Sequence, residues 1–181
     1  MNSGKKFEND WKKSIKNIEQ IYYYRLKDSP SGFGQDSKFT RFTNNNPYDC
    51  YGFYNFHLFP MELKHTKNGS ISIQRYKTDK NKMIKLHQIE GLTEAGHYKG
   101  IWAGFVFNFI NEEKDINHTY WLSIIDFNQF LKENAKKSIN EKDTIIYNGI
   151  LINAEKKRVN YIYNVLELLN SLIEKERSVD G

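Results

Sequence analysis

The sequence has one cysteine, three prolines and no long apolar run. The shortage of cysteine and the absence of an apolar run each exclude a class of protein. A single thiol, Cys50, excludes an internal disulfide and a zinc cluster of several thiolates, and it fits a reducing compartment. No run approaches the roughly 20 apolar residues that span a bilayer, and the N-terminus has no apolar signal core. We therefore expect no membrane segment and a cytoplasmic protein.

The remaining composition is that of one globular domain with a mild excess of positive charge. The chain of 181 residues is long enough for a sizeable core but short for two domains, and no repeat or linker divides residues 1–181. The formal net charge of +5 favours a polyanionic partner, although it equally suits a solvated surface.

Hydrophobic periodicity predicts helices at both ends of the chain and strands between them. Residues 4–21 carry apolar side chains three and four positions apart, as a half-buried helix does, with Ser3 as its N-cap. Further helices are expected at 83–98, at 127–133 after a capping Asp126 and at 158–176, and strands at 22–26, 50–56, 59–66, 101–110, 118–124 and 144–152. Mixed strands with helices before, between and after them indicate an α/β sandwich.

Two acidic residues and a lysine lie where one strand is expected to run out, turn and return beside itself. Twelve residues separate Asp49 from Glu62, and such a return can bring the two carboxylates together. Because side chains alternate along a strand, Glu62 and Lys64 share one face while Met61 and Leu63 point into a core. Two carboxylates beside an ammonium suit metal-assisted phosphodiester cleavage. An exposed edge strand with solvated Glu and Lys side chains is the ordinary alternative.

Five short segments carry a resemblance that extends over nearly the whole chain except residues 27–46. They are Asn2-Ser3-Gly4-Lys5 with Phe7-Glu8, Asp49-Cys50-Tyr51-Gly52, Glu62-Leu63-Lys64, His87-Gln88-Ile89-Glu90 and Lys137-Ser138-Ile139. In their order and spacing these segments resemble the RecU family of Holliday junction resolvases, in the PD-(D/E)XK nuclease superfamily. The resemblance implies a single domain with a restriction-endonuclease-like mixed β-sheet flanked by helices.

The resemblance also implies roles for five residues. Asp49 and Glu62 correspond to metal-binding carboxylates, Lys64 to the catalytic lysine, and Glu8 to a further acidic, metal-binding member of the site. Gln88 corresponds to a polar helix residue that orients the lysine, a water or a phosphate. From the residues alone, a favourable interaction with the helix dipole is the preferred explanation of Glu8. The expected metal is Mg²⁺, with Mn²⁺ as a substitute, since carboxylates are available and several thiolates or imidazoles in metal-ligand spacing are not.

Basic residues expected to contact DNA are spread over the chain. They are Lys5, Arg25, Lys27, Lys38, Arg41, His87 and Lys137. A buried helix histidine explains His87 equally well. Residues 27–46 interleave basic and aromatic side chains, which suits either a segment that lies on nucleic acid or a loop folded onto the domain. The RecU family has a longer stalk here that engages the junction centre, so the resemblance implies catalysis more safely than junction specificity.

The implied activity is hydrolysis of DNA phosphodiesters by a homodimer, which resolves four-way junctions through two symmetric nicks in recombination, repair or phage DNA processing. Branched DNA is the expected partner, and the resemblance also allows a recombinase as a protein partner. Three alternatives stay open: a restriction-like or flap-selective endonuclease, a non-catalytic DNA-binding protein that modulates recombination, and a structural protein with an incidental basic surface. The coexistence of Asp49, Glu62 and Lys64 favours catalysis, because pure binding has little use for carboxylates that face phosphate.

Overall fold

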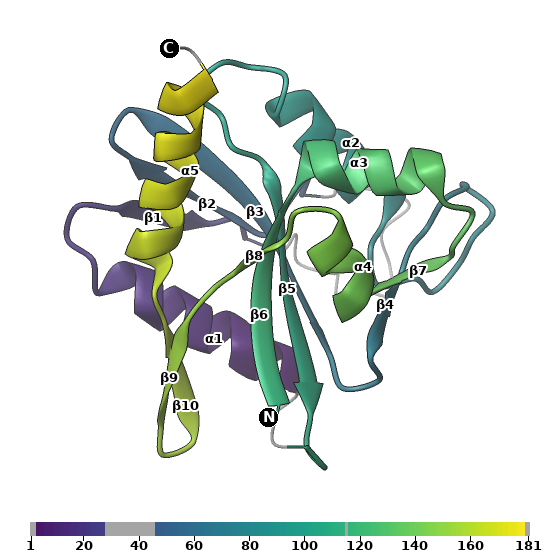
Figure 1. Ribbon diagram of the computed structural model, residues 1–181, viewed down its shortest axis with the longest axis horizontal. Coiled ribbons are helices and arrows are strands. Elements are labelled where there is room, and N and C mark those ends of the chain that lie inside the picture. The colour runs from purple at the N-terminus through teal and green to yellow at the C-terminus, as the bar shows by residue number, and fades with distance from the viewer. Residues whose placement is uncertain (1–2, 28–45, 115, 180–181) are drawn as a thin grey trace, which may run out of the picture.

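The computed structural model describes residues 3–27, 46–114 and 116–179, and its centre is a six-stranded mixed sheet (Figure 1). In spatial order the strands are β1 (Tyr22–Arg25), β2 (Cys50–Tyr54), β3 (His57–Thr66), β5 (Gly104–Asn111), β6 (Ile116–Ser123) and β8 (Ile150–Leu151). β3 runs parallel to β5, and the other neighbours in this sheet are antiparallel. The predicted mixed sheet is confirmed.

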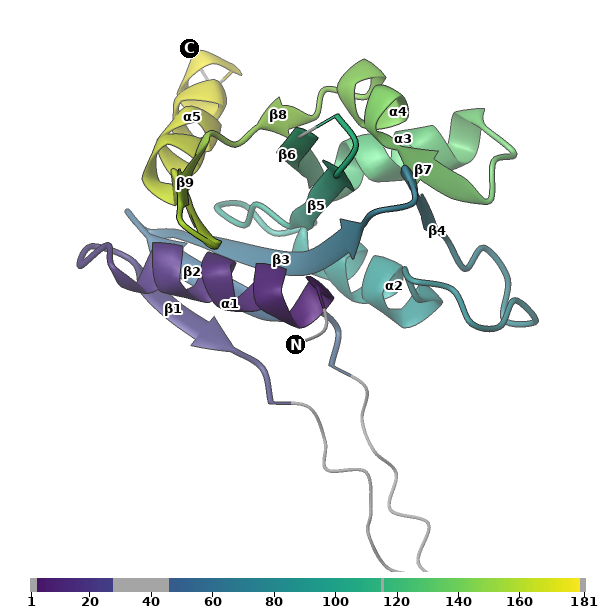
Figure 2. The same cartoon turned by 90° about the horizontal axis from the view of Figure 1, so that it is seen from below.

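Helices cover both faces of this sheet (Figure 2). α1 (Ser3–Lys16) and α5 (Val165–Val179) pack on one face, and α2 (Leu86–Ala95) and α3 (Ile124–Glu133) pack on the other. Smaller elements are the pair β4 (Ser70–Ser72) and β7 (Ser138–Asn140), the short helix α4 (Glu141–Ile146), and the hairpin of β9 (Ala154–Lys157) and β10 (Asn160–Tyr163). Among the described residues, no helix is long and apolar enough to cross a membrane.

The sheet separates two hydrophobic cores, so its middle strands are buried on both faces. In β5, Val106 joins the core under α1 and α5, whereas Phe105 and Phe107 join the core under α2 and α3. This double burial explains why the sequence of β5 is a continuous apolar run instead of an alternating one. The strand β3 lies between β2 and β5, so the alternative of an exposed edge strand around Glu62 is wrong.

Some predicted helix and strand boundaries are wrong for local reasons. Ser3 is the first residue of α1 and not its N-cap, and α1 ends at Lys16. The N-cap of α3 is Ser123, whose Oγ accepts a hydrogen bond from the backbone N–H of Asp126 at 3.0 Å. Of the strand expected over 144–152, only β8 (Ile150–Leu151) is a strand, and α4 takes up 144–146, because Asn140 begins a helix through a capping box with Asp143.

The predicted helix over 158–176 starts late because residues 154–163 form the hairpin of β9 and β10. Arg158 makes its turn with a left-handed φ of 54°. The hairpin is held by α1: the Asp10 carboxylate accepts from the backbone N–H of Tyr161 at 3.2 Å, and Ser14 Oγ accepts from that of Tyr163 at 2.9 Å. These contacts join segments about 150 positions apart, which local periodicity does not reveal.

Gly104 lies at the closest approach of β5 and β6, and it provides a test of this packing. A Cβ on Gly104 would lie 2.5 Å from the backbone oxygen of Leu122 and 2.7 Å from Cζ2 of Trp121. Because a carbonyl within the central sheet cannot swing aside, we predict that Gly104→Ala lowers the free energy of unfolding by about 1–3 kcal/mol. The matched control is Gly52→Ala, whose Cβ would meet side chains at 3.5 Å or more. Urea unfolding compares them, and equal stability would contradict the packing.

Candidate active site

The return of the chain from β2 to β3 places Asp49 beside Glu62. Cys50 pairs with Met61 in the antiparallel register, so the preceding residue, Asp49, lies opposite Glu62 on one face of the sheet. Asp49 Oδ2 accepts a hydrogen bond from the backbone N–H of Leu63 at 2.9 Å, and the Asp49 N–H donates to the Met61 carbonyl at 3.1 Å. Both bonds fix Asp49 against the strand that carries Glu62.

Glu62 is a buried carboxyl group held by two donors. Its side chain is 1% exposed, and its Oε1 accepts hydrogen bonds from Lys64 Nζ and from Gln88 Nε2, each at 2.6 Å. Its Oε2 is buried, and no described residue donates a hydrogen bond to it. A buried carboxylate oxygen without a donor is costly, so a proton or a cation beside Oε2 would lower the free energy.

The pKa of Glu62 reflects this environment. Burial raises the pKa of the carboxyl group to about 8; the Lys64 ammonium opposes the increase, and the negative charge of Asp49 adds to it. Near neutral pH the side chain of Glu62 therefore tends to hold a proton. A bound cation would favour the loss of that proton, because both occupy the same carboxylate oxygens.

Lys64 and Gln88 reach the same carboxyl group from different elements. Lys64 follows Glu62 by two positions on β3 and therefore shares its face. Gln88 lies in the first turn of α2, where its Oε1 accepts from the backbone N–H of Lys85 at 2.8 Å. One amide thus caps the helix and orients Glu62. The sequence predicted that Gln88 orients the lysine, a water or a phosphate, but its contact in the structure is with the carboxyl group.

Glu8 lies outside this acidic pair and contacts Arg25 instead. Its Oε2 is 2.7 Å from Nη1 of Arg25 on β1. Partial burial lowers the pKa of the Arg25 guanidinium. The negative charges of Glu8 and then Asp49 raise it by more, so the pKa lies above its ordinary value. Within the described ranges no three His, Cys, Asp or Glu side chains form a group that could hold a metal. The expected three-carboxylate centre of Glu8, Asp49 and Glu62 is therefore not assembled.

An open cleft of about 520 Å³ connects Glu8 with the lysine of the acidic site. Its lining residues come from the start of α1, the end of β3, the turn that follows, and one residue before α2. They are Ser3, Gly4, Glu8, Leu63, Lys64, His65, Thr66, Lys67, Asn68 and Met83. Lys64 therefore contacts the buried carboxyl group and also lines the cleft, where a phosphate could approach its ammonium.

Two residues predicted to contact DNA lie beside the acidic pair. Arg25 is there, but its guanidinium binds Glu8, a role that the sequence did not indicate. His87 in α2 is half-buried; burial and then the charge of Lys64 lower its pKa. Its position fits either expected role, a contact to DNA or a helix histidine packed against the domain.

The other described residues predicted to contact DNA lie on different elements, and of these Lys27 is near the acidic pair, because the preceding backbone N–H, of Leu26, donates to the Asp49 carbonyl at 2.9 Å. Lys5 is exposed on α1, Lys27 is exposed just after β1, and Lys137 is exposed directly before β7. Lys38 and Arg41 lie outside the described residues, as does most of the segment 27–46.

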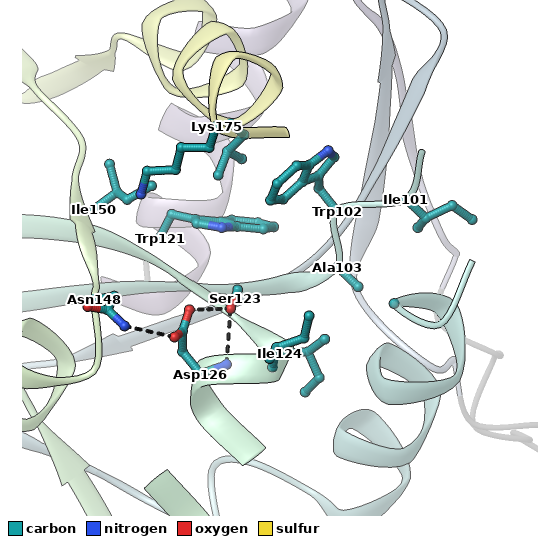
Figure 3. Close-up of a pocket in the computed structure, with 13 residues that line it drawn as sticks. Ile101, Trp102, Ala103, Trp121, Ser123, Ile124, Asp126, Asn148, Ile150 and Lys175 are labelled. Atoms are coloured by element: carbon teal, nitrogen blue, oxygen red, sulfur yellow. Dashed lines mark hydrogen bonds between the residues drawn. The ribbon is translucent and has the colours of Figure 1, made fainter. Parts of the chain in front are cut away.

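A second pocket, of about 220 Å³, lies between α5, β6 and the start of α3 (Figure 3). It is mainly apolar, with the indoles of Trp102 and Trp121 in its lining. Its carboxylate, Asp126, accepts hydrogen bonds from Asn148 Nδ2 at 3.0 Å and from the Ser123 hydroxyl. Both oxygens of Asp126 are engaged and no second carboxylate lines this pocket, so it lacks the paired chemistry of the acidic site.

Comparison with known proteins shows that the chain is similar in sequence to a prophage protein. No family model matches it. It is 36% identical over 190 residues to the SPbeta prophage-derived uncharacterized protein YotM of Bacillus subtilis (strain 168), an alignment that covers 99% of this chain and 91% of that relative. Among solved structures, it is similar to Hjc, a Holliday junction resolvase of Archaeoglobus fulgidus, with a TM-score of 0.46 and 16% identity over 81% of this chain and 94% of that chain. This structural likeness is too weak to carry an argument, and neither comparison shows the RecU family.

The raised pKa of Glu62 predicts how stability depends on pH without added metal. The folded carboxyl group has a pKa of about 8 against an ordinary 4.5, so its contribution to stability is fully present below pH 4.5 and is lost as the pH rises through 8. Glu62→Gln removes this titration. In urea unfolding with a chelator, the variant should gain stability relative to wild type as the pH rises from 5 to 8, by at most about 1.4 kcal/mol per pH unit.

A control separates this effect from the loss of any carboxylate. Glu112 is exposed, and its hydrogen bond and ion pair with Lys67 lower its pKa, so Glu112→Gln should not show the same gain. Parallel pH profiles for wild type and Glu62→Gln would contradict the assignment of a raised pKa to Glu62.

Proposed function

We propose that this chain, which belongs to the family of the SPbeta prophage-derived protein YotM, is a metal-dependent endonuclease that hydrolyses DNA phosphodiesters. The observation that carries the proposal is the pairing of half-buried Asp49 with buried Glu62, where Glu62 Oε2 lacks a donor among the described residues and the Lys64 ammonium lies alongside. A purely structural ion pair would satisfy its buried oxygens. A surface that only binds DNA would present cations to phosphate and would not need this pair.

The chemistry of the pair fits a hard divalent cation, Mg²⁺ or Mn²⁺. The oxygens of Asp49 and Glu62 are the ligand type that such cations prefer, and the described site offers no thiolate or imidazole pair in their place. Burial, and then the negative charge of Asp49, raise the pKa of Glu62, and a bound cation would offset both by favouring the ionised carboxylate. When bound, the cation would polarise a phosphate oxygen and make a water molecule more acidic.

The remaining side chains have roles that their contacts support. Lys64 faces the cleft, and its ammonium stabilises the negative charge that grows on the phosphate during attack. Gln88 is a positioning residue, since it holds Glu62 through Oε1 while its own carbonyl is fixed by the start of α2. Glu8 acts from outside the pair by holding Arg25, whose guanidinium lies near enough to Asp49 to respond to its charge.

For this endonuclease activity we propose the four-way DNA junction as the substrate. The support is the resemblance of the Glu8, Asp49 and Glu62-Leu63-Lys64 segments to RecU resolvases. Resolution takes two symmetric nicks, so the protein would act as a homodimer with two acidic sites, and its twofold symmetry would match that of the junction. The same chemistry would act on a flap or a duplex, and the test below includes both.

A cleavage assay tests the proposal. Wild type, Asp49→Asn and Glu62→Gln are incubated with Mg²⁺ and a labelled four-way junction, or with linear duplex and flap DNA of the same arm sequences. We expect paired symmetric nicks in the junction from wild type and no cleavage from either variant. In EDTA near neutral pH, Glu62→Gln should bind the junction about as tightly as wild type, because Glu62 holds a proton there; above pH 8 it should bind more tightly, because the substitution then removes a negative charge beside phosphate.

Three outcomes would count against parts of the proposal. Equal loss of binding and cleavage in Glu62→Gln would contradict a catalytic role for that carboxyl group, and Glu112→Gln, with an exposed carboxylate removed, should keep both. Cleavage of duplex as readily as of junction would retain the endonuclease and overturn the junction as substrate. Absence of cleavage on every substrate would overturn the endonuclease.

A further inference from the structure

Four aromatic side chains form an exposed ladder on β1 and β2. In the antiparallel register Tyr22 pairs with Phe53 and Tyr24 pairs with Tyr51. Because these are alternate positions on each strand, all four rings stand on one face of the sheet. The ring centroid of Tyr51 lies 5.6 Å from that of Tyr24 and 6.4 Å from that of Tyr22. We call these four residues the aromatic ladder.

The aromatic ladder is open to solvent, whereas the other face of the same strands is packed. Tyr22 is 59% exposed, Phe53 44% and Tyr24 39%. Tyr23, between Tyr22 and Tyr24 on β1, packs against the core under α1, and Cys50, directly before Tyr51 on β2, belongs to that core. On the face of the ladder, α2 packs over β3 and α3 packs over β5 and β6, so the helical cover lies toward the other strands (Figure 1).

On β2 the aromatic ladder lies directly next to Asp49 of the acidic pair. Asp49, Tyr51 and Phe53 are alternate residues and therefore share a face, with Tyr51 only ~7 Å along the chain from Asp49. Arg25 follows Tyr24 on β1 but lies on the opposite face, where it binds Glu8; the positive charge nearest this end of the ladder that is open to solvent is Lys27, which is exposed just after β1. Exposed rings in a row beside positive charge are the means by which proteins hold single-stranded nucleic acid, since bases stack on the rings and cations face the phosphates.

From this continuity we propose that the aromatic ladder is a stacking platform for unpaired bases of the DNA strand whose phosphodiester lies at the acidic pair. The inference rests on the proposed function and narrows its substrate. A continuous duplex keeps its bases stacked inside, so the platform favours DNA with splayed or unpaired nucleotides beside the cut. Stacking on a flat ring is tolerant of sequence, because every base has a π-face.

A second copy of the chain is the competing occupant of this surface. Four partly exposed rings offer roughly 300–500 Å², whereas a stable interface takes about 800 Å² from each partner. The rings also lie on the same face of the sheet as Asp49, at a site whose chemistry suits phosphate. Both observations favour nucleotides.

The experiment uses the full chain with Asp49→Asn, so that DNA is bound and not cut. Its probes are a DNA fork with 2-aminopurine in an unpaired arm and a fully paired duplex of the same sequence. We expect Tyr24→Leu combined with Tyr51→Leu to lower fork affinity about 5- to 100-fold and to abolish the quenching of 2-aminopurine, with duplex affinity unchanged. Replacing both by Phe keeps the rings and should keep binding, as should Tyr76→Leu, which removes an exposed ring outside the ladder.

Unchanged fork affinity in the double Leu variant would overturn the platform. Conversion of a dimer to a monomer by the Leu changes, seen in sedimentation velocity with equal loss of fork and duplex binding, would assign the ladder to an interface between copies and overturn it too. If wild type cleaves DNA but the ring changes leave fork binding intact, only the platform fails. If wild type cleaves nothing while ring changes still weaken fork binding, the endonuclease fails and the platform stands.

Discussion

A carboxyl group buried in a middle strand of the sheet is the constraint on which the rest of the site depends. Glu62 is 1% exposed, at a position where the neighbouring strand presents the buried ring of Phe105. Leaving a charge there without partners would cost several kcal/mol. Lys64 and Gln88 offset part of this cost through Oε1, but Asp49 brings a second negative group and Oε2 has no donor within the described structure. The site is therefore incomplete without a proton or a cation.

The surrounding elements hold this unfavourable arrangement in place. The backbone N–H of Leu63 fixes Asp49, and the start of α2 fixes Gln88, so neither can turn away from Glu62 to relieve the strain on the pair. Arg25 lies on the other side of Asp49 and is itself held by Glu8 from α1. Two of the helices that cover the sheet, α1 and α2, thus each contribute one polar side chain near the acidic pair, while their apolar residues supply packing.

The features of the site that depend on local pattern could be predicted from the sequence. Alternation along 59–66 predicted that Glu62 and Lys64 share a face, and a return after Asp49 predicted its approach to Glu62. The sequence did not reveal that Arg25 binds Glu8, because that contact depends on how α1 lies against β1. The role of Glu8 in a metal centre was predicted from resemblance, and the structure pairs it with a cation instead.

The errors in the fold have similar causes. A strand was expected over 144–152, yet Ile145 and Ile146 lie in α4 and are 54% and 61% exposed, and the capping box of Asn140 and Asp143 was the overlooked indication of a helix. The hairpin before α5 is polar on β9 and is held by contacts to distant α1, so periodicity could not indicate it. The aromatic ladder had a visible pattern in the sequence, but only the register shows that its four rings share a face with Asp49.

Calorimetric titration with Mn²⁺ tests the central claim most directly, because it measures whether the acidic pair holds a divalent cation without reference to any DNA. Wild type should bind Mn²⁺, Asp49→Asn and Glu62→Gln should each bind it at least about tenfold more weakly, and Glu112→Gln, which removes an exposed carboxylate, should match wild type. Equal Mn²⁺ affinity in wild type, Asp49→Asn and Glu62→Gln would contradict the account.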